Sequence, residues 1–238
     1  MRIAMWSGPR NLSTAMMYAF GNRTDFAVWD EPFYAPYLAQ TGYDHPVAHH
    51  ILAHHETDPV LVGKRCLGPI PHQKPHFYMK HMPHHMLYRF PLDWAKDCVH
   101  IHLIRHPARV IASYLDKRGA ATFDDIGFAQ QAQMYRALGG LVIDSADMRA
   151  DPKMMLQGLC DVIGLPFDPA MLSWDAGPRA DDGVWAKHWY GAVHQSTGFA
   201  GVEGPLPTLT GENAALLQKA LPIYKKMHAA RLSLTSLC

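Results

Sequence analysis

The sequence predicts an α/β protein with a central, mainly parallel sheet. Short uncharged apolar runs recur along the chain, and most are followed by a pattern of helical period. Such runs are typical of strands that helices cover on both faces. The length of 238 residues, 48% of them hydrophobic, fits one globular domain over 1–238. The predicted strands are 3–6, 26–29, 76–80, 99–104 and 141–143.

The first strand, 3–6, leads into a tight loop and then a helix. Gly8 and Pro9 end the strand, apolar residues from Leu12 onward recur at helical spacing, and Asn11 or Ser13 suits the N-cap. A helix N-terminus behind a loop of free N–H groups is a ready anion site.

Three side chains strengthen this anion site. Arg10 contributes a cation, and Ser13 and Thr14 contribute hydroxyl donors. The loop is no Walker A motif, because Ser13-Thr14 stands where Gly-Lys is needed. Taken alone, the stretch is equally compatible with an ordinary turn that carries a surface arginine.

Charged residues follow the second and third strands. The strand 26–29 ends in Asp30-Glu31, and the strand 76–80 delivers Lys80 and His81. Ligands of doubly wound sheets bind at the carboxyl ends of the strands. We expect Glu31 as a candidate general base and Asp30 as a solvated turn residue, while Lys80 joins Arg10 and Glu31 at this edge unless it is merely solvated.

The fourth strand, 99–104, ends in Arg105, and Pro107 opens the next helix. Arg105 and Ser113 could hold one phosphate, the arginine by charge and a fork of donors and the serine by its hydroxyl. An ordinary salt bridge is the alternative for Arg105.

The remaining segments are mainly helical. We expect helices over 123–138, over 152–163 with Asp151 as N-cap and Gly164 as its end, and from 210 to about 232 with an interruption near Pro222. The run Pro59–Val62 is of uncertain type, and 34–55 is an irregular or helical excursion. The long irregular stretch 168–207 is typical of a lid or binding loop.

Composition narrows the class of protein. A net charge of +1 gives no sign of a general nucleic-acid or membrane-surface partner. No apolar run approaches the ~20 residues of a membrane span, and the start shows no secretory signal. The scattered Cys66, Cys98, Cys160 and Cys238 suggest reduced thiols, so we expect a cytoplasmic protein.

The 16 histidines raise the question of a metal site. No H-E-x-x-H motif, cysteine partner or regular ligand set accompanies them, so we expect solvated or aromatic-packed histidines and no metal.

Three ordered stretches resemble the sulfotransferase family that uses 3′-phosphoadenosine 5′-phosphosulfate. The stretch 9–14 is similar to the family's 5′-phosphosulfate loop, and 105–113 is similar to its 3′-phosphate motif, an Arg-x-Pro with a Ser eight residues after the Arg. The stretch 147–166 is similar to a later segment common in bacterial members. The resemblance runs over about 1–170 and implies a P-loop NTPase-like three-layer α/β/α fold.

The resemblance also implies roles for residues. Arg105 and Ser113 would hold the 3′-phosphate, and Lys80 would lie at the bridging oxygen with Arg10 beside it. Branches of the family differ in the catalytic base, which ranks Glu31 first and His81 second. The implied donor-binding loop is Gly8, Pro9, Arg10, Asn11, Leu12, Ser13 and Thr14.

Two features depart from the family pattern. Asn11-Leu12 replaces the usual Ser-Gly, and for the C-terminal Arg-Lys-Gly-x-x-Gly loop the stretch 197–204 is only a loose substitute. The implied reaction moves a sulfuryl group to a hydroxyl or amine of a small acceptor, without a metal. A magnesium-ATP-dependent small-molecule kinase and a non-catalytic nucleotide-binding P-loop protein are the alternatives. The acceptor's identity and the oligomeric state are not readable; aromatics and histidines hint at a small, partly apolar or aromatic acceptor.

Overall fold

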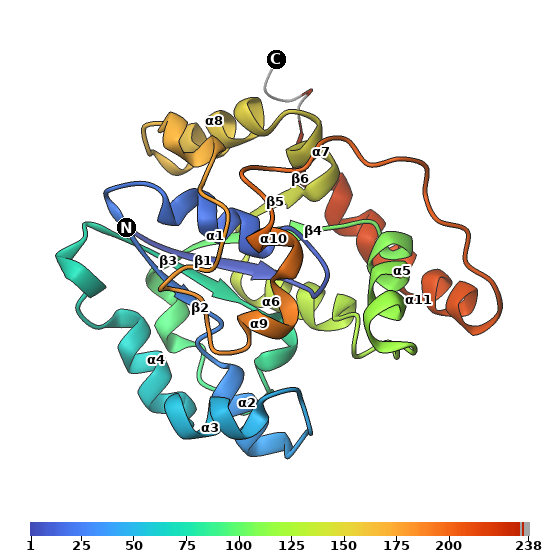
Figure 1. Cartoon of the computed structure of the whole chain (residues 1–238), viewed down its shortest axis with the longest axis horizontal. Coiled ribbons are helices and arrows are strands. Elements are labelled where there is room, and N and C mark those ends of the chain that lie inside the picture. Colours follow the sequence, from blue (N-terminus) through green and yellow to red (C-terminus); the bar gives the residue numbers. More distant parts are fainter. Residues whose placement is uncertain (234, 236–238) are drawn as a thin grey trace.

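A six-stranded, fully parallel sheet forms the centre of the molecule (Figure 1). The computed structural model describes residues 1–233 and 235, so Cys238 lies outside the described residues. The strand order is β2-β3-β1-β4-β5-β6. The strands are β1 (Arg2–Ser7), β2 (Phe26–Asp30), β3 (His76–His81), β4 (Val99–Ile104), β5 (Leu141–Asp144) and β6 (Arg231–Leu232).

Eleven α-helices and four short 3₁₀ turns connect the strands in the described part of the chain. The α-helices are α1 (Ser13–Gly21), α2 (Tyr34–Thr41), α3 (Ala48–His54), α4 (Pro59–Leu67), α5 (Pro107–Arg118), α6 (Phe128–Leu138), α7 (Ser145–Ala150), α8 (Pro152–Ile163), α9 (Ala186–Trp189), α10 (Gly191–His194) and α11 (Gly211–Ala229). The 3₁₀ turns are η1 (Pro71–Gln73), η2 (Pro83–His85), η3 (Asp93–Asp97) and η4 (Pro169–Leu172).

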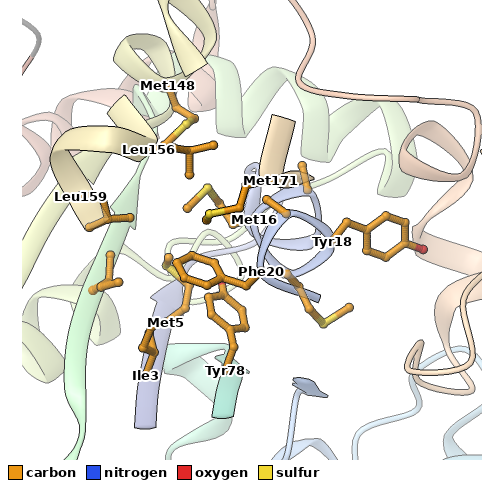
Figure 2. Close-up of a cluster of buried hydrophobic side chains, with 14 of the residues drawn as sticks. Ile3, Met5, Met16, Tyr18, Phe20, Tyr78, Met148, Leu156, Leu159 and Met171 are labelled. Carbon is orange, nitrogen blue, oxygen red and sulfur yellow. The ribbon is translucent and has the colours of Figure 1, made fainter. Parts of the chain in front are cut away.

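Helices cover both faces of the sheet. On one face, α1, α7 and α8 enclose a core with Met5 and Phe20 at its centre, and Figure 2 shows Met148 and Leu156 reaching it from α7 and α8. On the other face, α4 and α6 pack over the half of the sheet that carries Trp6, and α5, α6 and α11 pack over β4 and β5. Because both faces are covered, the charged residues of β1, β2 and β5 stand at the strand ends and the interiors of these strands are apolar.

All five predicted strands are present, while several helix boundaries differ. Helix α1 begins at Ser13, but its N-cap is Leu12 and no side chain caps it. Helix α4 begins at Pro59 with Asp58 as a true cap, which resolves that uncertain run. Helix α6 begins only at Phe128, after a turn.

The C-terminal helix corrects two expectations. Helix α11 passes through Pro222 unbroken, ends at Ala229, and is followed by β6 where further helix is expected from the sequence. A helix-interior proline costs about 3 kcal/mol. The apolar face that includes Leu216 and Tyr224 packs on β4 and β5, and this burial outweighs the cost.

The segment 168–207 is irregular but not detached from the domain. It contains η4, α9 and α10, and its Trp185 and Tyr190 are only 1% and 5% exposed. Both side chains pack with α2 and α3 at the edge of the sheet. Its role as a lid stays a prediction.

Two further features concern the described residues only. Cys66, Cys98 and Cys160 are free thiols. A search of the same residues finds no helix with the length and apolar character needed to cross a membrane.

Candidate active site

A cavity of about 930 Å³ opens at the carboxyl edge of the sheet. Its walls bring together most of the sequence-predicted site residues, which are Pro9, Arg10, Asn11, Leu12, Ser13, Thr14, Glu31, Lys80, Arg105 and Ser113. Gly8 lies behind the loop, where a Cβ atom would meet the carbonyl oxygen of Ile126 at 3.3 Å. Parallel strands all end at one edge, so the topology itself gathers these residues.

The loop after β1 is held in shape by contacts with β4 and α5. Arg10 has a left-handed backbone (φ +57°) and donates from Nε to Ser113 Oγ at 3.0 Å. Arg105 donates to the Arg10 carbonyl oxygen at 2.6 Å. Asn11 donates to the Leu103 carbonyl oxygen at 3.1 Å and accepts from the Leu12 amide at 2.8 Å, so it braces the loop instead of capping α1. Burial, and then the charge of Arg105, lowers the pKa of Arg10.

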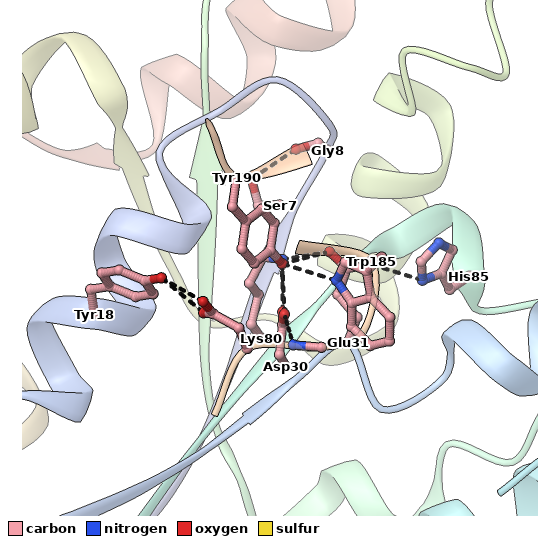
Figure 3. Close-up of polar contacts among 11 residues, drawn as sticks. Ser7, Gly8, Tyr18, Asp30, Glu31, Lys80, His85, Trp185 and Tyr190 are labelled. Atoms are coloured by element: carbon pink, nitrogen blue, oxygen red, sulfur yellow. Dashed lines mark hydrogen bonds and ion pairs between the residues drawn. The ribbon is translucent and has the colours of Figure 1, made fainter. Parts of the chain in front are cut away.

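A buried cluster of charges lies at the ends of β2 and β3 (Figure 3). Lys80, 1% exposed, donates to Asp30 at 2.9 Å, to Glu31 at 2.5 Å and to the Tyr190 hydroxyl at 2.6 Å. Its three N–H donors are therefore all used. Burial alone lowers the pKa of Lys80, but the charges of Asp30 and Glu31 outweigh it and the net shift is upward.

Glu31 occupies a strained position directly after β2. Its φ is +43°, a region that few non-glycine residues adopt, and its amide donates to the Lys80 carbonyl oxygen at 2.9 Å. One carboxylate oxygen accepts from Lys80, and the other faces His85 Nδ1 at 3.8 Å. Burial raises the pKa of Glu31, Lys80 opposes that rise, and Asp30 adds to it.

Asp30 is not the solvated turn residue expected from the sequence. It is 3% exposed, binds Lys80, and accepts from the Tyr190 hydroxyl at 2.7 Å and from the Gly183 amide at 3.1 Å. The irregular segment thus covers the carboxylate and supplies its donors. No local pattern around Asp30 could reveal the donors from Gly183 and Tyr190, because they lie 153 and 160 residues away along the chain.

His81 lies on the opposite face of β3 from Lys80. Its ring stacks on Trp6 with centroids 4.6 Å apart and packs against Trp94 at 4.9 Å, in the core under α4. It does not line the cavity. Burial, followed by the charges of His100 and Lys80, lowers its pKa to about 3. The geometry does not support His81 as the base.

Three histidines that sequence reasoning did not select, His45, His84 and His85, line the cavity, and of these His85 faces Glu31. The His85 ring stacks on Tyr34 at 4.4 Å and on Tyr37 at 4.9 Å, and its Nδ1 has no hydrogen-bond partner among the described residues. Burial, followed by the charges of His84 and His45, holds the pKa of His85 well below its ordinary value and favours the neutral ring. Consecutive side chains of a strand point to opposite faces, so Lys80 and His81 cannot both face the cavity. This alternation is the sequence signal that favours the histidines after the strand over His81.

Three arginines converge on one carboxylate at the rim of the cavity. Arg105, which follows β4, donates to Glu203. Arg109 of α5 lies 3.1 Å from the same carboxylate, and Arg149 of α7 lies 3.7 Å from it. The stretch 197–204 therefore contacts Arg105 through Glu203. Arg109, Arg149 and Glu203 are absent from the sequence-predicted set.

The histidines do not assemble a metal centre in the part of the chain that the structure describes. No group of three or more His, Cys, Asp or Glu side chains there is arranged to hold a metal ion. Several histidines instead pack in the core: His102 contacts Tyr135, and His100 accepts from Trp6 Nε1 at 3.1 Å.

Comparisons with known proteins bear on the family and the fold of the chain. A family model described as a sulfotransferase domain matches residues 1–231. Among solved structures, a sulfotransferase from Alicyclobacillus acidocaldarius has a TM-score of 0.57 at 10% identity and covers 95% of this chain and 94% of its own. The sulfotransferase domain from the curacin biosynthetic pathway has a TM-score of 0.53 at 16% identity, with 91% and 96% covered. At such identities these two structures show the fold alone, and they confirm the expected three-layer α/β architecture.

Two curated relatives come from Arabidopsis thaliana. They are named branched-chain-amino-acid aminotransferase-like proteins 1 and 2, and they are 36% and 35% identical over 227 residues, or 93% of this chain. The chain spans 40% of the length of each relative.

Proposed function

The chain belongs to the sulfotransferase domain family, and we propose that it moves a sulfuryl group from 3′-phosphoadenosine 5′-phosphosulfate to a hydroxyl or amine of a small acceptor. One observation carries the proposal. The loop after β1 and the Arg105–Ser113 stretch contact each other directly and share one cavity with Lys80 and Glu31. This arrangement supports two adjacent anion sites beside one reaction centre.

The residues present fit this donor. Ser13, Thr14 and the loop amides would hold the 5′-phosphosulfate at the N-terminus of α1. Arg105 and Ser113 would hold the 3′-phosphate. The convergence of Arg105, Arg109 and Arg149 on the Glu203 carboxylate supports an oxyanion-binding role for this second position.

The donor supplies an activated sulfuryl group, and the chain's own residues manage charge and protons. Arg10 and Lys80 would neutralise the negative charge that grows on the bridging oxygen, as cations do in phosphoryl transfer. Because all three Lys80 donors are used, this contact would replace one of its present partners. These cations supply the charge that a metal ion supplies in kinases.

Glu31 is the proposed general base. Its carboxylate lines the cavity, and an acceptor oxygen between Glu31 and His85 would lie within reach of both. The acceptor side is aromatic and rich in histidine, with Tyr34, Tyr37 and Trp189 in its walls. This lining supports a small, partly apolar or aromatic acceptor.

Titration calorimetry with adenosine 3′,5′-bisphosphate tests the donor site. Arg105→Ala removes a charged hydrogen-bond donor, so we expect binding to weaken by ~1.5–3 kcal/mol, or roughly 10- to 150-fold. Arg136→Ala is the matched control, because Arg136 is exposed on α6 and outside the cavity. Equal binding by wild type and Arg105→Ala refutes the 3′-phosphate site.

Two further measurements separate the alternatives. Stabilisation by magnesium-ATP alone, without a response to the bisphosphate, would favour the kinase. If wild type transfers the sulfuryl group, and the Glu31→Gln variant binds the bisphosphate normally but transfers none, the protein is an enzyme. If wild type binds the bisphosphate yet never transfers, the result supports the non-catalytic protein.

A further inference from the structure

Glu203 lies on a stretch without helix or strand, between α10 and α11 (Figure 1). Its side chain is nevertheless only 9% exposed. Arg105, Arg109 and Arg149 surround the carboxylate, and two of them also hold the neighbouring backbone. Arg149 donates to the Gly201 carbonyl oxygen at 2.8 Å, and Arg109 donates to that of Gly204.

The arrangement has more positive charge than one carboxylate balances. Three guanidinium groups face Glu203, and the buried Nε of Arg105 has no hydrogen-bond partner among the described residues. Arg10, whose carbonyl oxygen accepts from Arg105, brings a fourth guanidinium nearby. A phosphate group carries more charge and more acceptor oxygens than a carboxylate, and guanidinium groups bind it in the same planar manner.

We infer that Glu203 is an internal competitor for the 3′-phosphate site. The inference rests on the proposed function. The carboxylate occupies the position of the phosphate until the donor arrives; the phosphate then displaces Glu203, takes over Arg105, Arg109 and Arg149, and releases the stretch 201–204 from the rim.

Two consequences follow for donor selection. A nucleotide with a 3′-phosphate displaces Glu203 at a cost in free energy, and the contacts of its phosphate with the three arginines offset that cost. A nucleotide without that phosphate leaves Glu203 in place. The apparent dissociation constant for the bisphosphate equals the intrinsic constant divided by the fraction of molecules in which Glu203 is released. A small released fraction therefore weakens the observed binding. Glu203 is thus a specificity-determining residue that acts on the affinity for the 3′-phosphate.

Titration calorimetry on the full chain tests this inference. Glu203→Gln keeps the shape of the side chain and removes its charge. We expect the variant to bind adenosine 3′,5′-bisphosphate at least ~10-fold more tightly than wild type, and adenosine 5′-monophosphate within ~2-fold of wild type, because roughly nine-tenths occupancy by Glu203 gives such a factor. Asp93→Asn is the control, since it also removes one negative charge but from an exposed pair with Lys96.

The outcomes are distinguishable. Bisphosphate affinity that is unchanged or weaker in Glu203→Gln, while wild type binds, overturns the competitor and leaves the proposed function standing. An equal gain for the monophosphate also overturns it, because the effect would then be independent of the 3′-phosphate. Absence of binding in both proteins refutes the proposed function and the inference together. If Glu203→Gln does not fold, Glu203→Asp, which shortens the reach, is expected to give a smaller gain, and no gain overturns the competitor.

Discussion

Lys80→Met tests the buried charge cluster. The substitution removes the cation and keeps the side-chain volume, so Asp30 and Glu31 lose their shared partner while 3% and 8% exposed. Removing one partner of a buried ion pair costs about 3–5 kcal/mol. The free energy of unfolding of native proteins is about 5–15 kcal/mol, so the variant would approach the limit of stability at neutral pH.

The pH dependence of this loss distinguishes charge from packing. Burial, with the charge of Asp30 adding to it, raises the pKa of Glu31, and Lys80 opposes that rise. Removing the Lys80 charge should therefore raise the pKa of Glu31 in the folded state further above its value in the unfolded chain. A raised carboxyl pKa gives stability that is present at low pH and lost as pH rises through the folded-state value. The difference between variant and wild type should therefore be greatest near pH 8 and shrink toward pH 5.

Urea unfolding at pH 5, 6, 7 and 8 measures this difference. Lys96→Met, in the exposed pair with Asp93, is the matched control and should change stability by less than about 1 kcal/mol at every pH. A loss below about 1 kcal/mol for Lys80→Met, or a loss that does not vary with pH, would refute the reasoning.

Two further predictions concern the base and a helix cap. The pKa of Glu31 is raised above its ordinary value of 4.5, so the transfer rate should rise with pH through a midpoint above pH 4.5. Glu31→Gln should remove this acidic limb of the pH–rate profile. If the limb persists in the variant, the base is another residue. Asp151 accepts from the Met154 amide at 2.9 Å at the start of α8, so Asp151→Ala should lower the free energy of unfolding by ~1 kcal/mol in urea titration, with the exposed Lys153→Ala as an unaffected control. An equal effect of both substitutions would contradict the assigned cap.

The position of the site could be predicted from the sequence because it depends on local patterns. Uncharged runs mark buried parallel strands, and all such strands present their carboxyl ends at one edge. Glu31, Lys80 and Arg105 stand at or just after the end of such a run, and Arg10 stands in the loop that follows one, so their convergence needs no knowledge of side-chain contacts.

Strand geometry also explains why His81 does not line the cavity. Consecutive residues on a strand point to opposite faces, and Lys80 takes the face that reaches the cavity. His81 consequently enters the core beside Trp6, whereas His84 and His85, from the turn after the strand, line the cavity.

The sequence by itself determined where the strand-forming runs lie along the chain, the loop after β1 and the residues at the strand ends. Only the tertiary structure decided that Asp30 is buried, that Tyr190 reaches Lys80, and that Glu203 lies among three arginines. The physical reason is range. Strand and helix patterns reflect neighbours within a few residues, whereas these ion pairs and hydrogen bonds join segments about 50 to 160 residues apart. The contacts of Tyr190 and Glu203 depend on how the irregular segment folds back over the sheet.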